Sequence, residues 1–307
     1  IIFLTKKQVI SIFLILLFLL GVFIFSFSKK STSTFSTIGK SKTLKWDVTG
    51  DGIKDNININ TNKLKYSIEV VSKDKKSELA PNSKLNTFGE YSKEWPLRLT
   101  LKDISRDKTP EIITQSSEKN KAIQHIFLNK DGEFKDIFWN SNNTIGIIDS
   151  QNNRTPKVVT AKYSSYGFDF SNYILINDKL EKYTCTIAED YMGKSTAFKL
   201  INYIQALPSG EIYKPKDIFD PSLKGTELAT IGKMASENSI YTFQDSFFED
   251  TKYDKNGDAL EVSWVLNFKG ININTNESKN YTLNIFMKKS AINETSYKYQ
   301  IYYINLT

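Results

Sequence analysis

The sequence has only one cysteine, Cys185, and one histidine, His125, among its 307 residues. A lone cysteine excludes an intramolecular disulfide, and the pair cannot supply the ligands of a structural Cys/His zinc site. A cysteine–histidine nucleophile would need the two residues to meet, but both lie in alternating apolar stretches that are typical of ordinary strands. No nucleophile-elbow motif accompanies His125, so the sequence argues against most familiar hydrolases.

The net positive charge is small outside the N-terminal end, because acidic residues nearly balance the basic ones. The formal net charge is +7, and four of these charges come from Lys6, Lys7, Lys29 and Lys30, with no acid before residue 31. This leaves +3 for residues 31–307. No basic stripe stands out there, so we expect no nucleic-acid partner.

Residues 9–27 form a 19-residue run without a charge. As a helix the run would be roughly 28 Å long at ~1.5 Å per residue, close to the thickness of the bilayer core. A cleaved secretory signal and an uncleaved anchor both fit, but no A-x-A-like cleavage site follows, which favours the anchor. We therefore predict an N-terminal membrane anchor over residues 1–28, with the globular body on the extracytoplasmic side of the cell membrane.

A Ser/Thr-rich linker, residues 29–44, precedes a motif that occurs three times. The copies are "DVTGDGIKD" from Asp47, "DISRDKTPE" from Asp103 and "DSQNNRTPK" from Asp149. Position five holds Asp51, Asp107 and Asn153, and position nine holds Asp55, Glu111 and Lys157. A β-rich run follows each copy. Repetition of this kind predicts blade-like or stacked β units over residues 45–190.

The first copy has the composition of a calcium loop. Calcium binds about six to eight hard oxygen ligands, and closely spaced acids on one turn supply them. The expected ligands are Asp47, Thr49, Asp51, the carbonyl of Ile53, and Asp55. Position twelve is Asn58 instead of glutamate, so the loop is not a helix–loop–helix EF-hand. The alternative is an Asp/Gly turn with solvated carboxylates.

The other two copies depart from this composition. The second copy offers Asp103, Asp107 and Glu111 as metal ligands but contains no glycine. The third copy ends in Lys157, a cation at a ligand position, and is expected to bind no metal. We expect Ca²⁺ to have a structural role, because nothing in the motif marks the open coordination position and base that catalysis needs.

The pattern Asp-x-Thr-Gly-Asp-Gly-x-x-Asp followed by a strand resembles the calcium loop of FG-GAP/VCBS-type repeats. The resemblance covers roughly residues 45–188. Repeats of that family form β-propeller blades on exported proteins, so the resemblance implies a partial or small β-propeller-like domain. Known closed propellers have at least about four blades. A partial propeller, an undetected blade and a different stacking of β units all remain open.

Residues 191–307 have a different pattern. Apolar spacing predicts a helix over 195–207, and Asp220 with Pro221 suggests the start of a second, shorter helix. Four alternating runs predict strands near residues 240–248, 259–269, 280–288 and 296–305. This order predicts an α+β domain with an antiparallel meander, similar to NTF2-like or cystatin-like folds. The whole chain is expected to be mainly β, with an N-terminal transmembrane helix.

Two hypotheses for function follow. The first is a membrane-anchored, exported and non-catalytic binding or scaffolding protein, whose partner is a cell-surface protein or a glycan. The alternative is an envelope-associated glycan hydrolase that uses paired carboxylates from "QDSFFED", namely Asp245, Glu249 or Asp250. Paired carboxylates perform that reaction at separations of ~5 to 9.5 Å.

Overall fold

The fold is mainly β, as predicted, with two α-helices among the described residues. The computed structural model describes residues 7, 34–73, 75–149, 155–184, 190–209, 215–223, 225–290 and 297–307. Within these residues no sheet closes into a barrel. No described helix is long and apolar enough to cross a membrane, and the anchor expected at residues 9–27 lies outside the described part of the chain.

The first sheet is a four-stranded antiparallel meander, ordered β2 (Lys42–Trp46), β3 (Asp55–Asn62), β4 (Lys65–Ser72) and β5 (Lys75–Glu78). Side chains alternate across a strand. In β3 this alternation buries Ile57 and Ile59 and directs Asn56, Asn58 and Asn60 to the opposite, more exposed face. The first sheet therefore packs through one face only.

The second sheet contains the meander β6 (Leu97–Lys102), β7 (Glu111–Glu118), β8 (Lys121–Lys130) and β9 (Glu133–Asn140). Strand β1 (Thr34–Ile38) pairs antiparallel with the remaining edge of β6. Seven of the eight residues of β7 are buried, so both faces of this sheet are covered. In the β8–β9 turn Asp131 and Gly132 have φ values of 53° and 80°, as a type I′ hairpin requires.

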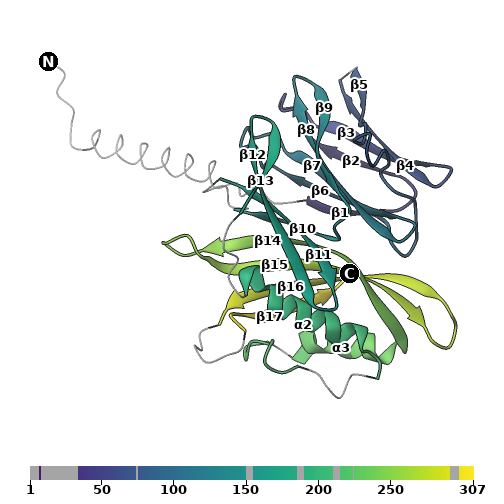
Figure 1. Cartoon of the computed structure of the whole chain (residues 1–307), viewed down its shortest axis with the longest axis vertical. Coiled ribbons are helices and arrows are strands. Elements are labelled where there is room, and N and C mark those ends of the chain that lie inside the picture. The colour runs from purple at the N-terminus through teal and green to yellow at the C-terminus, as the bar shows by residue number, and fades with distance from the viewer. Residues whose placement is uncertain are drawn as a thin grey trace. The chain divides into compact units, whose positions relative to one another are not determined.

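The third meander is continuous with the C-terminal strands. It consists of β10 (Thr144–Ile148), β11 (Lys157–Ser164), β12 (Gly167–Ile176) and β13 (Lys179–Tyr183). Strand β10 pairs in parallel with β14 (Ser239–Tyr253), which is followed by β15 (Ala259–Asn272), β16 (Ser278–Lys289) and β17 (Tyr299–Leu306). These strands form one eight-stranded sheet (Figure 1). Strands from both sides of residue 190, where the sequence suggested a domain boundary, thus belong to the same sheet.

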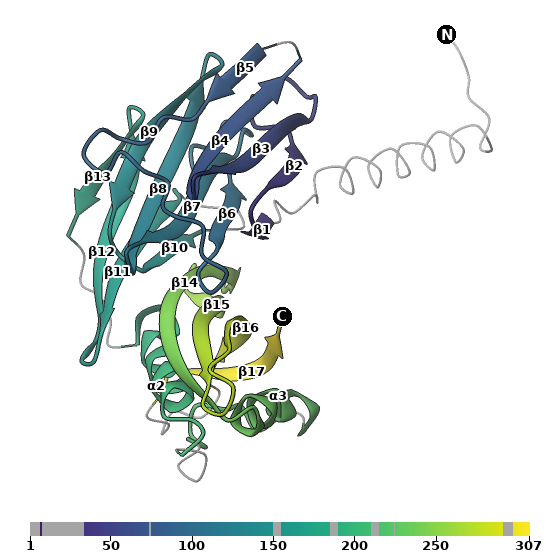
Figure 2. The ribbon, with the colours of Figure 1, turned by 90° about the vertical axis from the view of Figure 1, so that its right-hand side faces the viewer.

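Two helices cover one face of the C-terminal strands (Figure 2). Helix α2 (Lys194–Gln205) lies close to the segment predicted to be helical, and its buried residues Leu200 and Ile204 join the core around Trp264. Helix α3 runs from Gly225 to Ser236. The helix begins five residues after Asp220, so Asp220 is not its N-cap, and the Asp220 carboxylate instead accepts a hydrogen bond from the Ser222 amide, 2.8 Å away, in the preceding turn.

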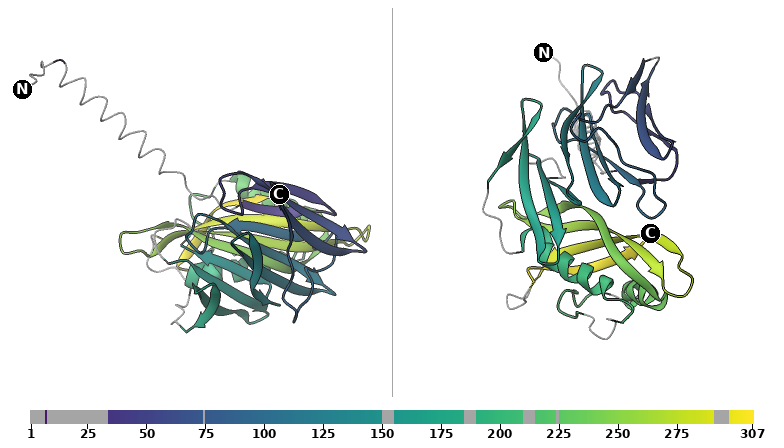
Figure 3. Two further views of the ribbon diagram at one scale, coloured as in Figure 1. Left: turned by 90° about the horizontal axis from the view of Figure 1, so that it is seen from above. Right: turned by 45° about the vertical axis from the view of Figure 1, so that its right-hand side comes forward.

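The three meanders lie side by side (Figure 3). Apolar side chains are buried between them. Ile57 and Ile68 of the first sheet share a core with Leu99 of the second. Ile113 and Ile126 of the second sheet share another core with residues of the third, including Ile145, Ile147 and Val158. The largest core joins the third meander, both helices and strands β14–β17.

Gly146 in β10 is a point of close packing at which we predict a loss of stability. A Cβ at this position would lie 2.3 Å from two atoms of the Phe248 ring. Phe248 is fully buried and stacks on Trp264 with the ring centroids 4.5 Å apart, so it has little room to move. We expect Gly146→Ala to lower the free energy of unfolding by about 1–3 kcal/mol in urea titrations.

Gly232→Ala is the control for this prediction. Gly232 lies in α3, and no atom lies within 4 Å of the Cβ that the substitution adds. Alanine favours helices over glycine, so this change should be neutral or stabilise the protein by up to ~1 kcal/mol. Equal losses in the two variants would show that the contact with Phe248 does not limit position 146.

Candidate functional site

The recurring aspartate motif occupies the same place in each meander. Residues 47–55, the first loop, connect β2 to β3, and residues 103–111, the second loop, connect β6 to β7. Residues 149–157, the third loop, connect β10 to β11, but residues 150–154 lie outside the described part of the chain. Each loop joins the first and second strands of its meander, so the repeat in the sequence is also a repeat in the structure.

Carboxylates fix the backbone of the first loop. Asp47 accepts hydrogen bonds from the amides of Gly50 and Gly52 at 2.7 and 2.8 Å. The Asp55 Oδ2 atom, buried at the start of β3, accepts from the Val48 amide at 2.9 Å. It also accepts from the amide and hydroxyl of Thr49 at 3.0 and 3.1 Å. These contacts close the turn without any further group.

The second loop repeats this pattern of hydrogen bonds. Asp103 accepts from the amides of Arg106 and Lys108 at 2.7 and 3.1 Å, which are the positions of Gly50 and Gly52 in the first loop. Glu111 Oε2 accepts from the Ile104 amide at 2.6 Å, as Asp55 does from Val48.

The two loops keep this geometry although the glycines are replaced. Gly50 and Gly52 have φ values of 78° and 82°, and Arg106 and Lys108 have 66° and 75°. Side-chain-bearing residues rarely adopt this left-handed region and do so at an energetic cost. The carboxylates, and not the glycines, are therefore what the two loops share.

Neighbouring loops also touch one another. Gly50 lies so close to Thr109 that a Cβ at position 50 would be 2.4 Å from the Thr109 hydroxyl oxygen. The Arg106 guanidinium forms an ion pair with Asp149, the first residue of the third loop. The first loop, the second loop and Asp149 at the start of the third thus follow one another along one edge of the stacked meanders.

The first loop fits a cation in part. The buried Asp55 Oδ1 atom has no hydrogen-bond partner, which leaves a carboxylate oxygen available to a metal. Lys73, however, already lies 2.9 Å from Asp51, and this ammonium lowers the pKa of the Asp51 carboxyl. Among the described residues no three His, Cys, Asp or Glu side chains form a group that could hold a metal ion. A cation would have to displace Lys73, whose pair with Asp51 is exposed and therefore weak.

The second loop differs in its electrostatics. Burial raises the pKa of Glu111 to about 7, and burial also raises the pKa of Asp103. A carboxyl group that is removed from water becomes easier to protonate, since its charged form loses hydration. Arg106 and Lys108 add two cationic side chains to this loop. Protonation of Glu111 removes one negative charge from the second loop, and the two cationic side chains offset others. Both effects reduce the repulsion among the carboxylates of this loop without a metal.

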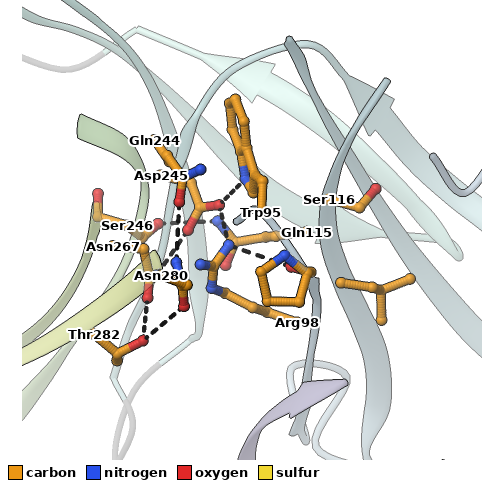
Figure 4. Close-up of polar contacts among 12 residues, drawn as sticks. Trp95, Arg98, Gln115, Ser116, Gln244, Asp245, Ser246, Asn267, Asn280 and Thr282 are labelled. Atoms are coloured by element: carbon orange, nitrogen blue, oxygen red, sulfur yellow. Dashed lines mark hydrogen bonds and ion pairs between the residues drawn. The ribbon is translucent and has the colours of Figure 1, made fainter. Parts of the chain in front are cut away.

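A buried polar cluster joins the second sheet to the C-terminal strands (Figure 4). The Arg98 side chain in β6 is fully buried, and its Nη1 atom donates to Asp245 Oδ2 at 2.5 Å. The indole of Trp95 donates to the same oxygen, and Asn267 Nδ2 donates to Asp245 Oδ1 at 2.7 Å. Burial raises the pKa of Asp245 although Arg98 opposes this shift.

Further hydrogen bonds extend the cluster on both sides. Gln115 Nε2 donates to the Ser246 carbonyl at 3.0 Å, and Gln244 Nε2 donates to the Glu94 carbonyl at 2.8 Å. The Thr282 hydroxyl donates to Asn267 Oδ1 at 2.7 Å. This cluster was not predicted from the sequence. Its only local signal is a charged residue inside an apolar strand, as in "LRLTL" and "FQDSFF".

The carboxylates of the hydrolase hypothesis lie at this same junction. Asp245 is engaged as described, and Glu249 lies 3.0 Å from the Lys102 ammonium. Asp250 is fully buried and accepts a hydrogen bond from the Asp149 amide at 2.6 Å. Asp245 and Glu249 join β14 to β6, and Asp250 holds the residue after β10 beside β14. These contacts do not favour glycan hydrolysis.

Of the two residues of the cysteine–histidine hypothesis, His125 is described by the structure. His125 lies in β8, as its alternating sequence predicted, and is fully buried. Its Nδ1 atom lies 2.7 Å from Asp136, and its Nε2 atom lies 2.9 Å from the Thr87 carbonyl oxygen. Both ring nitrogens therefore hold the structure together, and Cys185 lies outside the described residues.

Comparison with the models of known protein families finds no match, and no curated protein matches the chain. A function therefore has to be inferred from the residues themselves. The repeated loops and the arrangement of the strand edges are the features that bear on it.

Proposed function

We propose that the chain is an exported binding or scaffolding protein, without catalytic activity, that is anchored to the cell membrane through residues 9–27. In this proposal residues 45–188 are FG-GAP/VCBS-type repeats, and the three meanders are blade-like units of a partial, open propeller. The partner is a protein or a glycan at the cell surface. Residues 191–307 form the α+β part, with two helices packed on the strands of a meander.

The observation that carries this proposal is the agreement between the first two loops. Asp47 and Asp103 bind the amides three and five residues ahead, and Asp55 and Glu111 bind the amide that follows the first aspartate. The hydrogen bonds agree more closely than the sequences do, because the second loop lacks both glycines of the first loop. It supports a common repeat unit in which carboxylates fix a corner between two strands.

We further propose that the first loop binds Ca²⁺ for structural stability. Its ligands would be Asp47, Thr49, Asp51, the Ile53 carbonyl and Asp55, and the free Asp55 Oδ1 atom supports this set. A cation here would hold the first and second strands of the meander at a fixed corner. An affinity on the order of 0.1 to 1 mM would suit an extracellular protein. Arg106 and Lys108 disfavour a metal in the second loop.

Calorimetric unfolding with and without calcium tests this proposal. At a calcium concentration of 100 times the dissociation constant, we expect the free energy of unfolding to rise by about 2.7 kcal/mol. Asp51→Asn should abolish the response, because it removes a ligand charge. Lys73→Met should strengthen binding, because it removes the competing ammonium.

Asp107→Asn is the matched control for Asp51→Asn. Asp107 holds the same position in the second loop, where its carboxylate accepts from the Thr109 amide at 2.7 Å. This variant should keep the full calcium response. A response that survives Asp51→Asn but disappears in Asp107→Asn would move the metal to the second loop, and the absence of any response would refute the calcium site.

A further inference from the structure

The first strand of each meander has an outer edge that faces away from the meander, and in two of the three meanders another strand pairs with this edge. Strand β1 pairs with the edge of β6, and β14 pairs with the edge of β10. Strand β2 holds the same place in the first meander, but β3 is its only partner among the described strands (Figure 2). No described residue forms a backbone hydrogen bond with the outer edge of β2. An open row of amide and carbonyl groups is a template for strand addition.

The side chains of β2 divide between two faces. Leu44 lies opposite Ile57 and packs partly against the core between the first and second sheets. Trp46, on the same face, keeps 37% of its surface exposed. Lys45 lies opposite Asn56 and shares the outer, polar face of the sheet. A strand added at β2 would therefore meet Leu44 and Trp46, together with the exposed Lys42, on one face and Lys45 on the other.

Unneutralised positive charge follows this edge. Lys40, Lys42 and Lys45 are exposed, and none of them forms an ion pair with a described carboxylate. Lysines on an edge strand repel a second copy of the same strand and discourage non-specific pairing. The same charges attract a strand that carries acids, since opposite charges on neighbouring strands are favourable.

We propose that the free edge of β2 binds an extended segment of a partner protein in which acidic and aliphatic residues alternate. The segment would continue the first sheet by β-strand addition, with main-chain hydrogen bonds for affinity and the two faces of β2 for selectivity. Its aliphatic side chains would cover Leu44 and Trp46, and its acids would lie beside Lys45. The proposal specifies a partner for the binding role proposed above, but it depends neither on the repeat family nor on calcium.

A synthetic peptide of alternating glutamate and valine, seven residues long and capped at both ends, serves as the probe. Binding to the full chain, purified in mild detergent with EDTA, is measured by fluorescence anisotropy and by hydrogen exchange. We expect saturable binding and slower exchange at amides within residues 42–46. Lys45→Glu, which reverses a charge on the proposed contact face, should weaken binding by about tenfold or more.

Lys76→Glu is the matched control, because Lys76 lies on β5, the opposite edge of the same sheet. This variant should bind the peptide as the wild-type chain does. A peptide with a central proline cannot complete the strand and should bind much more weakly. Because EDTA is present, failure of this test leaves the calcium experiment unaffected.

Three outcomes would overturn the proposal. Equal binding of the proline peptide would show that charge alone attracts the probe. Slower exchange at another strand edge, with residues 42–46 unchanged, would place the binding site elsewhere. Slow exchange at residues 42–46 without peptide, together with a dimer in sedimentation, would show that a second copy of the chain occupies the edge.

Discussion

Asp245→Asn is expected to lower the free energy of unfolding by about 3–5 kcal/mol, the usual result of removing one partner from a buried ion pair. The Arg98 side chain is fully buried, and its other described acceptor, the Pro96 carbonyl oxygen, is 3.4 Å away. The substitution would leave the guanidinium without a counter-charge. The NH₂ group of the new asparagine would also face a hydrogen-bond donor, because both oxygens of the Asp245 carboxylate accept hydrogen bonds. Urea unfolding followed by tryptophan fluorescence measures the loss.

Two further variants make this prediction specific. Arg98→Met together with Asp245→Asn removes both charges, so the double variant should be less destabilised than the two single losses added together. Glu261→Gln breaks the exposed Lys252–Glu261 pair across β14 and β15, and should change stability by less than about 1 kcal/mol. If Asp245→Asn lowered the free energy of unfolding by no more than Glu261→Gln does, the result would show that water reaches Arg98.

The stability of the protein should fall as pH rises between about 4.5 and 7, because of Glu111. Its pKa is 4.5 when the chain is unfolded and is raised to about 7 by burial in the native state. The native state therefore binds a proton in this range that the unfolded state has lost, and this favours folding at low pH only. Each pH unit corresponds to ~1.4 kcal/mol, so the contribution amounts to about 3 kcal/mol over the whole range.

Glu111→Gln isolates this effect, because a glutamine can still accept the Ile104 amide but does not titrate. In EDTA the variant should match the wild-type chain near pH 4.5 and be more stable by about 3 kcal/mol near pH 8. The raised pKa of Asp103 acts in the same direction in both proteins and cancels in the difference. Parallel stability curves from pH 4.5 to pH 8 would show that Glu111 remains ionised in the folded protein.

Local sequence patterns predicted the elements that depend on local physics. The β-rich run after the first loop and the apolar spacing in α2 are each set within a few residues. The strands β14–β17 also lie close to the four predicted runs. The recurrence of the loops was visible because carboxylates at fixed spacing were kept in two copies.

Contacts between distant segments were not predictable in this way. Strand β10 pairs with β14 across about a hundred residues of sequence, and nothing in "TIGII" indicates which strand lies beside it. Arg98 and Asp245 are 147 residues apart, and each alone looks like an ordinary charged residue. Arg106 and Lys108 adopt left-handed backbone conformations that residues with side chains rarely adopt. The absence of glycine from the second loop therefore hid its structural similarity to the first loop.

The asparagines on the outer face of the first sheet disfavour the stacking of another meander on that face. Asn56, Asn58 and Asn60 would each lose hydration if another meander were stacked on that side, and a buried amide without a partner is strongly unfavourable. A duplicated unit inserted before residue 42 would need aliphatic replacements on β3 before it could dock. The solvation of these amides therefore disfavours a further stacked unit on this face, while new strands can still be added at the edge.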